Sequence, residues 1–180
     1  MIFVVDACIA SSMGHEDSDD PISQNCRTIL MEISNQSHTI AINDKLFDEY
    51  KKNASKYFKE WFLIMLWKRR YEDVNGHEIL KLRSQIIASI YEYYNTLEDQ
   101  QATIAIVCKD VHLLEAALAT DKFVISNDNK CRNQLSCLMG INTEKLGLAN
   151  LIWVNSDDNL VTWFRNGAKV KEISEKWKLN

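Results

Sequence analysis

Two aspartates follow short apolar runs at positions where a parallel sheet would bring them together. Asp6 directly follows the run 2–5 (IFVV), and Asp128 closely follows the run 123–125 (FVI). Fully apolar runs of this length are typical of strands buried on both faces. Because open parallel sheets bind ligands outside the carboxyl ends of their strands, we expect both carboxylates at that edge.

Two further acids are expected at the same edge, placed there by helices. Glu49 lies in the opening turns of the helix predicted after a strand at 39–42. Asp110 begins a helix rich in Leu and Ala that leads into the strand containing Phe123. The predicted site therefore combines four carboxylates from four distant segments: Asp6, Glu49, Asp110 and Asp128.

Four clustered carboxylates require positive charge, since like charges a few ångströms apart repel each other and favour protonation. Mg²⁺ and Mn²⁺ prefer oxygen ligands of this kind. Two such ions about 4 Å apart can activate a water and stabilise the leaving oxygen of a phosphodiester. The sequence thus predicts two Mg²⁺ or Mn²⁺ ions, with these four acids as both metal ligands and catalytic residues. Cleavage would leave a 5′-phosphate and a 3′-hydroxyl.

Each acid, taken singly, also has a structural interpretation. An Asp after a strand or before a helix commonly caps the helix that follows, which applies to Asp6, Asp110 and Asp128. Glu49 could simply interact favourably with its helix dipole, and the neighbouring Asp48 is an alternative ligand. The joint placement of the four acids favours the metal site.

Other polar residues are candidates for contact with substrate. Ser126 and Asn127 could donate hydrogen bonds to a phosphate or a metal-bound water, although they are equally consistent with simple turn residues. Lys52 and Lys56 belong to a basic stretch and could attract the phosphates of a substrate, although charged helix residues commonly just face solvent. Glu115, in the same helix as Asp110, is predicted to be structural.

A basic and aromatic segment separates the second predicted strand from the later helices. From Lys45 to Arg83 there are ten basic and six acidic residues. Its aromatic residues could stack on bases or belong to the core or a dimer contact: Trp61, Phe62 and Trp67. His112 is predicted on a helix surface rather than as a catalytic base.

The elements that must position these residues alternate between strand and helix. Strands are predicted at 2–5, 39–42, 123–125 and 151–154. Helices are predicted from Pro21, from Asn43 or Asp44 to about Asn75–Gly76, and then at 79–94, 110–120, 129–139 and 160–166. Periodicity does not decide between helix and strand for 103–108. The alternation predicts an α/β fold with a mostly parallel sheet.

Length and composition set the remaining expectations. The 180 residues predict a single domain, with a core at about 2–154 and a helical, partly frayed tail at 156–180. The five cysteines form no CxxC pair and are expected to be reduced. No apolar run approaches the roughly 20 residues of a membrane span, and the start has no basic segment typical of a signal peptide. We therefore expect a cytoplasmic protein that does not enter a membrane.

Several segments together resemble the PIN domain, a nuclease family. The most specific is KDVHLLEAALATDKFVISND (109–128), and the opening FVVDACIA (3–10) is also similar. The segment EYKKNASKYFKEWFLIMLWKRR (49–70) resembles a subgroup of bacterial PIN-like proteins. The closing IWVN, WF and GA (152–168) resembles that subgroup more loosely.

The resemblance implies a three-layer α/β/α sandwich with a parallel sheet of four or five strands. It also implies Mg²⁺- or Mn²⁺-dependent hydrolysis of RNA, with Asp6, Glu49, Asp110 and Asp128 as the acidic set. PIN proteins of this size often act as toxins beside an antitoxin or in RNA processing, so RNA, an antitoxin protein and a second copy in a homodimer are the implied partners. Two residues depart from the family pattern. Cys8 stands where many PIN domains have a small polar residue, and Asn127 stands where some relatives have a second acid.

Three other classes of protein share some of these features. A haloacid dehalogenase-type phosphatase needs a second Asp two residues after the first, and Cys8 occupies that position. A response-regulator receiver needs an acidic pair and a late Lys, and neither is evident. A PIN-like domain that binds RNA or protein with little catalysis remains the alternative to the enzyme.

Overall fold

The computed structural model describes residues 1–14, 18–94, 101–136, 150–173 and 177–179. Its strands form one five-stranded, all-parallel sheet in the order β3-β2-β1-β4-β5. The predicted α/β class with a parallel sheet is thereby confirmed. The strands are β1 (Ile2–Val5), β2 (Thr39–Ile42), β3 (Tyr71–Asp73), β4 (Phe123–Ile125) and β5 (Ile152–Val154).

The direction in which strands are added reverses at the centre of the sheet. β2 and β3 follow β1 on one side, whereas the chain returns to place β4 and β5 on the other side. Val4 and Val5 pair with Val124 and Ile125 at this junction. The carboxyl ends of β1 and β4 therefore form a topological switch point, where open α/β sheets bind ligands.

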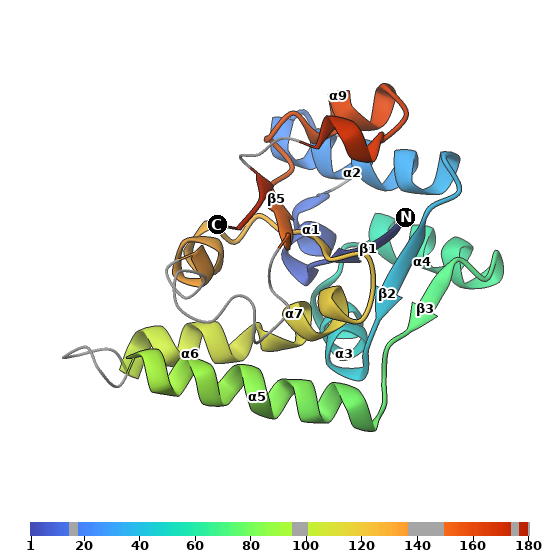
Figure 1. The fold of residues 1–180 in the computed structure, drawn as a ribbon. Helices are drawn as coiled ribbons and strands as arrows, with labels where there is room; N and C mark the ends of the chain where they lie inside the picture. The colour runs from blue at the N-terminus through green and yellow to red at the C-terminus, as the bar shows by residue number, and fades with distance from the viewer. Residues whose placement is uncertain (15–17, 95–100, 137–149, 174–176, 180) are drawn as a thin grey trace.

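Helices flank the sheet. They are α1 (Ala7–Ser12), α2 (Pro21–Asn35), α3 (Asp44–Asn53), α4 (Lys56–Trp67), α5 (His77–Tyr94), α6 (Gln101–Lys109), α7 (Val111–Leu118) and α9 (Leu160–Arg165). Residues 129–136 are also helical, and a short 3₁₀ turn covers Val170–Glu172. Figure 1 shows α2 and α9 together on one side of the sheet, with α5, α6 and α7 on the opposite side.

Aromatic packing joins the first strand to the C-terminal segment. Phe3 on β1 is fully buried, and its ring meets that of Phe123 on β4 edge-on at 4.9 Å. Trp163 on α9 stacks on Phe123 at 5.5 Å. Edge-on and offset aromatic pairs of this kind add to the stabilisation from burial alone. These contacts pack α9 against β1 and β4 of the sheet.

The prediction of a single long helix after the second strand is wrong, because two helices, α3 and α4, occupy this part of the chain. Ala54 has extended backbone angles, and Ser55 caps α4 by accepting a hydrogen bond from the N–H of Phe58. The N–H of Ser55 itself donates to the carbonyl of Ala10 in α1. Apolar residues keep the spacing of a helix across the end of α3 and the start of α4. Apolar spacing alone therefore did not reveal the boundary between the two helices.

A fifth strand was also missed. β3 pairs in parallel with β2 at the edge of the sheet, and its three residues, Tyr71–Asp73, are exposed. An exposed edge strand lacks the continuous apolar character of the other strands, which explains the omission. The ambiguous segment 103–108 is helical, within α6.

The C-terminal tail is more closely packed than predicted. Trp177 and Leu179 are buried, and the N–H of Leu179 donates to the carbonyl of Leu151. Lys178 forms an isolated antiparallel bridge with Ile152 on β5. The expectation of a frayed end is therefore wrong for these residues. In the described part of the chain, none of the helices is long and apolar enough to cross a membrane.

Candidate active site

The first predicted acid lies at the switch point between β1 and β4. The N–H of Asp6 donates to the carbonyl of Ile125 at 2.9 Å, which extends the pairing of the two strands by one residue. The Asp6 side chain is 8% exposed and caps α1 by accepting from the N–H of Cys8. Asp6 therefore caps the helix that follows it, as its structural interpretation predicts. Its second oxygen, Oδ2, faces the loop after β4.

Ser126 connects Asp6 with Asp128. Its hydroxyl donates to Oδ2 of Asp6 at 2.6 Å and accepts the N–H of Asp128 at 3.0 Å. Oδ1 of Asp128 in turn accepts the N–H of Cys131, so Asp128 caps the helix at 129–136. Two carboxylates that are distant in sequence are thus fixed around one buried hydroxyl.

Asp110 is the most strongly perturbed acid of the four. Its side chain is only 9% exposed and makes no capping hydrogen bond to the helix that it precedes. The pKa of Asp110 is raised to about 6, mainly by burial; the negative charges of Asp6 and Asp128 contribute to the increase, whereas Lys109 and His112 oppose it. The thiol of Cys131 hydrogen-bonds to the Asp110 side chain. Asp6 and Asp128 are therefore near enough to Asp110 to influence its ionisation.

Glu49 reaches this region from α3. The adjacent Tyr50 donates its hydroxyl to the carbonyl of Val5, one residue before Asp6. Oε2 of Glu49 lies 3.2 Å from Nε2 of His112, and Oε1 lies 3.4 Å from Nζ of Lys45. Burial acts to raise the pKa of Glu49, but the hydrogen bond and charge of His112, with Lys45, outweigh it and lower the pKa.

The structure distinguishes between the two neighbouring acids on α3. The Asp48 side chain is 59% exposed and pairs with Lys51, whereas the Glu49 side chain is 17% exposed and faces α7. Of the two, only Glu49 is turned toward the segment that begins at Asp110.

Sequence reasoning missed the role of His112. The expectation that it lies on a helix surface is wrong, because it is 3% exposed. Its Nδ1 lies 3.1 Å from the carbonyl of Lys109, and Nδ2 of Asn43 donates to the carbonyl of His112. The available signal was its position in a helix that is otherwise almost wholly apolar, since an amphipathic surface helix would carry more polar residues.

The remaining predicted residues are placed as follows. The Ser126 hydroxyl is fully buried, and the Asn127 side chain accepts the N–H of Ser156 and lies 3.7 Å from the thiol of Cys26. Both residues therefore use their polar groups within the fold. Lys52 and Lys56 are exposed, at the end of α3 and the start of α4. Whether any of these four contacts a substrate stays a prediction.

The aromatic residues of α4 divide into two groups. Trp61 and Phe62 are buried, and the indole N–H of Trp61 donates to the carbonyl of Leu30 in α2. These two belong to the core, in line with their structural interpretation. Trp67 is 83% exposed.

Thiols surround the loop after β4. The Cys8 thiol donates to Oδ2 of Asp6 at 2.9 Å, and the N–H of Asn127 donates to the same sulfur at 3.2 Å. Burial raises the pKa of Cys8, and Asp6 raises it further, so this group is a thiol at neutral pH. The four described cysteines are free, and Cys137 lies outside the described residues.

The predicted metal site depends on the oxygen donors that the described residues supply. Among the described residues, no three His, Cys, Asp or Glu side chains already converge as a finished metal site. The donor chemistry fits Mg²⁺ or Mn²⁺, since Asp6, Asp110 and Asp128 offer carboxylate oxygens that repel one another. A divalent cation among them would offset the repulsion that raises the pKa of Asp110.

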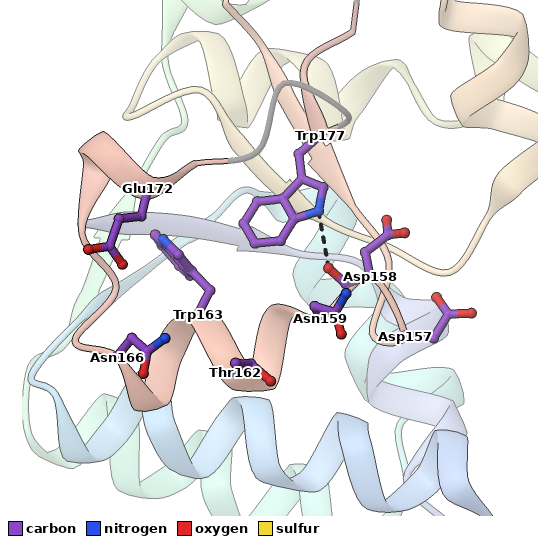
Figure 2. Close-up of a pocket in the computed structure, with 8 residues that line it drawn as sticks. All are labelled: Asp157, Asp158, Asn159, Thr162, Trp163, Asn166, Glu172 and Trp177. Carbon is purple, nitrogen blue, oxygen red and sulfur yellow. Dashed lines mark hydrogen bonds between the residues drawn. The ribbon is translucent and has the colours of Figure 1, made fainter.

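A separate hollow of about 440 Å³ lies beyond the end of β5 (Figure 2). Its walls include Trp163 and Trp177, whose rings meet edge-on, and the indole N–H of Trp177 donates to the carbonyl of Asp158. Asp158 also pairs with Arg132 at 2.8 Å. None of the four predicted acids lines this hollow, so the hollow is not part of the candidate active site.

Comparison of the chain with family models, with curated proteins and with solved structures found no match.

Proposed function

We propose that this protein is a metal-dependent endoribonuclease that hydrolyses RNA phosphodiester bonds. The observation that carries the proposal is the arrangement at the carboxyl ends of β1 and β4. The buried Ser126 hydroxyl joins the Asp6 carboxylate to the backbone of Asp128, and the buried Asp110 makes no capping hydrogen bond to the helix that it precedes. Strong perturbation of a carboxyl pKa at the switch point of a parallel sheet is typical of functional sites. The resemblance of 109–128 to PIN domains supports the same chemistry.

Each acid has a role in this proposal. Asp6, Asp110 and Asp128 would hold the first Mg²⁺ or Mn²⁺ ion, and Glu49 would contribute with Asp6 to a second. Bound there, the cations would provide a nucleophilic water at neutral pH and charge stabilisation for the leaving 3′ oxygen. The carboxylates would orient and neutralise the cations at the carboxyl end of the sheet.

The surrounding residues keep the carboxylates in place. Ser126 fixes Asp6 relative to Asp128, while His112 fixes Glu49 relative to the segment containing Asp110. Tyr50 attaches the helix of Glu49 to the end of β1. Supporting contacts of this type commonly change metal affinity or activity by 10- to 100-fold when removed.

The test is cleavage of a fluorescent single-stranded RNA in Mn²⁺, in Mg²⁺ and in EDTA. The proteins are wild type, the double variant Asp6→Asn with Asp128→Asn, and Asp157→Asn as a control for an exposed acid outside the cluster. We expect metal-dependent cutting with 5′-phosphate products, lost only in the double variant. Equal cutting by wild type and the double variant would overturn the proposal.

A binding-only protein is the second candidate, and one observation favours it. The acids already have structural roles, since Asp6 and Asp128 cap the helices that follow them and Glu49 pairs with His112. Calorimetric titration with Mn²⁺ separates the two, because the nuclease must bind the ion and must lose affinity on Asp110→Asn. An RNA-binding protein without metal affinity would favour this second candidate.

The implied partners and location stay predictions. An antitoxin protein and a homodimer follow from the resemblance, and a cytoplasmic location follows from the apolar pattern of the sequence. The preference for RNA over single-stranded DNA also follows from the resemblance. Running the same cleavage assay on a DNA of matched sequence tests that preference directly.

A further inference from the structure

The carboxyl ends of three neighbouring strands place three polar residues in one row. β4 lies between β1 and β5 in the sheet. The N–H of Asp6 donates to the carbonyl of Ile125 at 2.9 Å, and in the same way the N–H of Ser126 donates to the carbonyl of Val154 at 3.0 Å. Asp6, Ser126 and Asn155 therefore take the next positions after β1, β4 and β5, side by side.

This row belongs to the face of the sheet that α7 covers. Side chains alternate between the two faces along a strand, so Asn155 shares the face of Trp153, which pairs with Val124 on β4. Phe123, on the opposite face, packs against α9. α7 contacts β1 and β4 from the side away from α9 (Figure 1), and Asp110 directly precedes α7. The position of Asn155 is thus on the side of the sheet where Asp110 lies.

The side-chain amide of Asn155 is buried, and one half of it lacks a partner. The residue is 5% exposed, and its Nδ2 donates to Oδ1 of Asn129 at 2.5 Å. Its Oδ1 is buried without a hydrogen-bond partner among the described residues. Buried acceptors of native proteins are rarely left unpaired, and a bound ion or water is a common reason where one is found.

The hydrogen bond to Asn129 holds the amide beside the loop that contains Asp128. Asn129 directly follows Asp128 and begins the helix at 129–136, which Asp128 caps. The backbone of Asn155 is fixed as well, because its N–H donates to Oδ2 of Asp158 at 2.9 Å. The unpaired oxygen is therefore a fixed part of the same edge of the sheet as the candidate metal ligands.

We propose that Asn155 supplies a further oxygen donor, Oδ1, to the Mg²⁺ or Mn²⁺ ion of the candidate active site. This role rests on the proposed function, since it needs the cation that the acids would hold. Carbonyl oxygens suit both ions as ligands. A neutral donor also fills a coordination position without adding to the repulsion among the carboxylates.

A purely structural role for Asn155 is the alternative. In that case the residue acts through Nδ2 and its hydrogen bond to Asn129, and Oδ1 meets only a buried water. The two roles use opposite ends of one amide group. Substitutions that remove one end and keep the other therefore separate them.

The first experiment measures Mn²⁺ affinity by calorimetric titration of the full chain. Asn155→Ala removes both ends of the amide, Asn155→Asp keeps an oxygen and loses the N–H donor, and Asn129→Ala removes only the partner of Nδ2. We expect Asn155→Ala to weaken Mn²⁺ binding at least about 10-fold. Asn155→Asp should bind Mn²⁺ at least as tightly as wild type, and Asn129→Ala should keep the wild-type affinity.

The second experiment tests contact with the ion through metal preference. A thiolate is a soft ligand that favours Cd²⁺ over Mn²⁺. The ratio of Cd²⁺ to Mn²⁺ affinity should therefore rise at least about 10-fold in Asn155→Cys relative to Asn155→Ser. A residue that only supports the fold would not change this ratio. Thermal unfolding in EDTA checks that each variant folds, and where Asn155→Ala does not fold, the Asp, Cys and Ser variants decide.

Three results would overturn the proposal: equal Mn²⁺ affinity of wild type and Asn155→Ala, an equal loss in Asn129→Ala and Asn155→Ala, or an unchanged metal preference in Asn155→Cys. Mn²⁺ binding that Asp110→Asn loses and Asn155→Ala keeps would exclude Asn155 and leave the proposed function intact. Absence of Mn²⁺ binding by wild type would overturn the proposed function, and the role of Asn155 with it.

Discussion

The hydroxyl of Ser126 donates a 2.6 Å hydrogen bond to Oδ2 of Asp6, across 120 positions of the sequence. The same hydroxyl accepts the N–H of Asp128. One buried side chain therefore sets the relative position of two proposed metal ligands, which come from adjacent strands on either side of the switch point.

Ser126→Ala tests this relationship. Removal of the hydroxyl should lower the free energy of unfolding by about 1 kcal/mol and reduce metal-dependent RNA cleavage roughly 10- to 100-fold. Ser23→Ala is the control, because the buried Ser23 hydroxyl also makes a 2.6 Å hydrogen bond, to the carbonyl of Ser12. It should cost similar stability with unchanged cleavage. Equal losses of cleavage in both variants would mean that Ser126 acts only through stability.

Asp110→Asn should stabilise the protein when metal is removed. In EDTA at pH 8 the wild-type carboxylate is ionised, although burial and neighbouring acids hold its pKa at about 6. Removing that charge should raise the free energy of unfolding by up to about 3 kcal/mol, the equivalent of a shift of roughly two pKa units. Urea unfolding measures this. The same variant should lose metal-dependent cleavage, and a variant that is destabilised in EDTA would contradict the cluster.

His112 should matter through Glu49. His112→Ala removes the buried group 3.2 Å from Oε2 of Glu49, so metal-dependent cleavage should fall about 10- to 100-fold. His112→Gln retains a donor at a similar distance from the backbone and should recover part of that activity. Single-turnover cleavage at several Mn²⁺ concentrations measures the effect. If His112 positions Glu49, its loss should raise the Mn²⁺ concentration that is needed for half-maximal cleavage. An unchanged Mn²⁺ dependence in both variants would show that His112 only fills space.

The ion pair between Arg83 and Glu115 should be essential to the α5–α7 contact. Glu115 is fully buried, and both of its oxygens accept from the Arg83 guanidinium, at 2.5 and 2.7 Å. Arg83→Leu leaves a buried charge and should destabilise the protein by about 3 kcal/mol. The double variant with Glu115→Leu should recover most of that loss. Thermal unfolding of the single and double variants measures the coupling, and simple additivity would contradict it.

Acid should destabilise the protein partly through His38. Burial lowers the pKa of His38, and its Nε2 is buried without a hydrogen-bond partner among the described residues. Because the unfolded chain binds that proton more readily, stability falls as the pH drops through about 6.5, the unfolded value. Urea unfolding at pH 7.5 and 5.5 should show a smaller loss for His38→Phe than for wild type. An identical loss in both proteins would exclude His38 as a contributor.

Much of the fold was predictable because its signals are local. The apolar runs at 2–5, 39–42 and 123–125 are strands as predicted, since continuous apolar runs suit strands covered on both faces. The break at Ala54 and the edge strand β3 were not predictable from apolar spacing. The cap at Ser55 lies within a continuous run of helically spaced apolar residues, and β3 is an exposed edge strand. Neither feature produces a strong pattern of apolar residues in the sequence.

The candidate site also combines residues that were predictable from local patterns with features that were not. Positions after strands and before helices were enough to nominate Asp6, Asp110 and Asp128. The choice of Glu49 over Asp48 and the burial of His112 depend on how α3 packs against α7, which no local pattern encodes. The role of Ser126 depends on contact with a strand that lies 120 positions away.

The alternation of strands and helices and the types of side chain at the strand ends can be inferred from the sequence, because they follow from the local apolar period and from the residues that cap helices. Which of those side chains meet depends on the tertiary fold. The reversal of strand order between β1 and β4 brings Asp6 beside Asp128, and the packing of α7 buries Asp110 next to them. Strand order and helix packing are set by the total burial of apolar surface across the whole chain, and no segment carries that information alone.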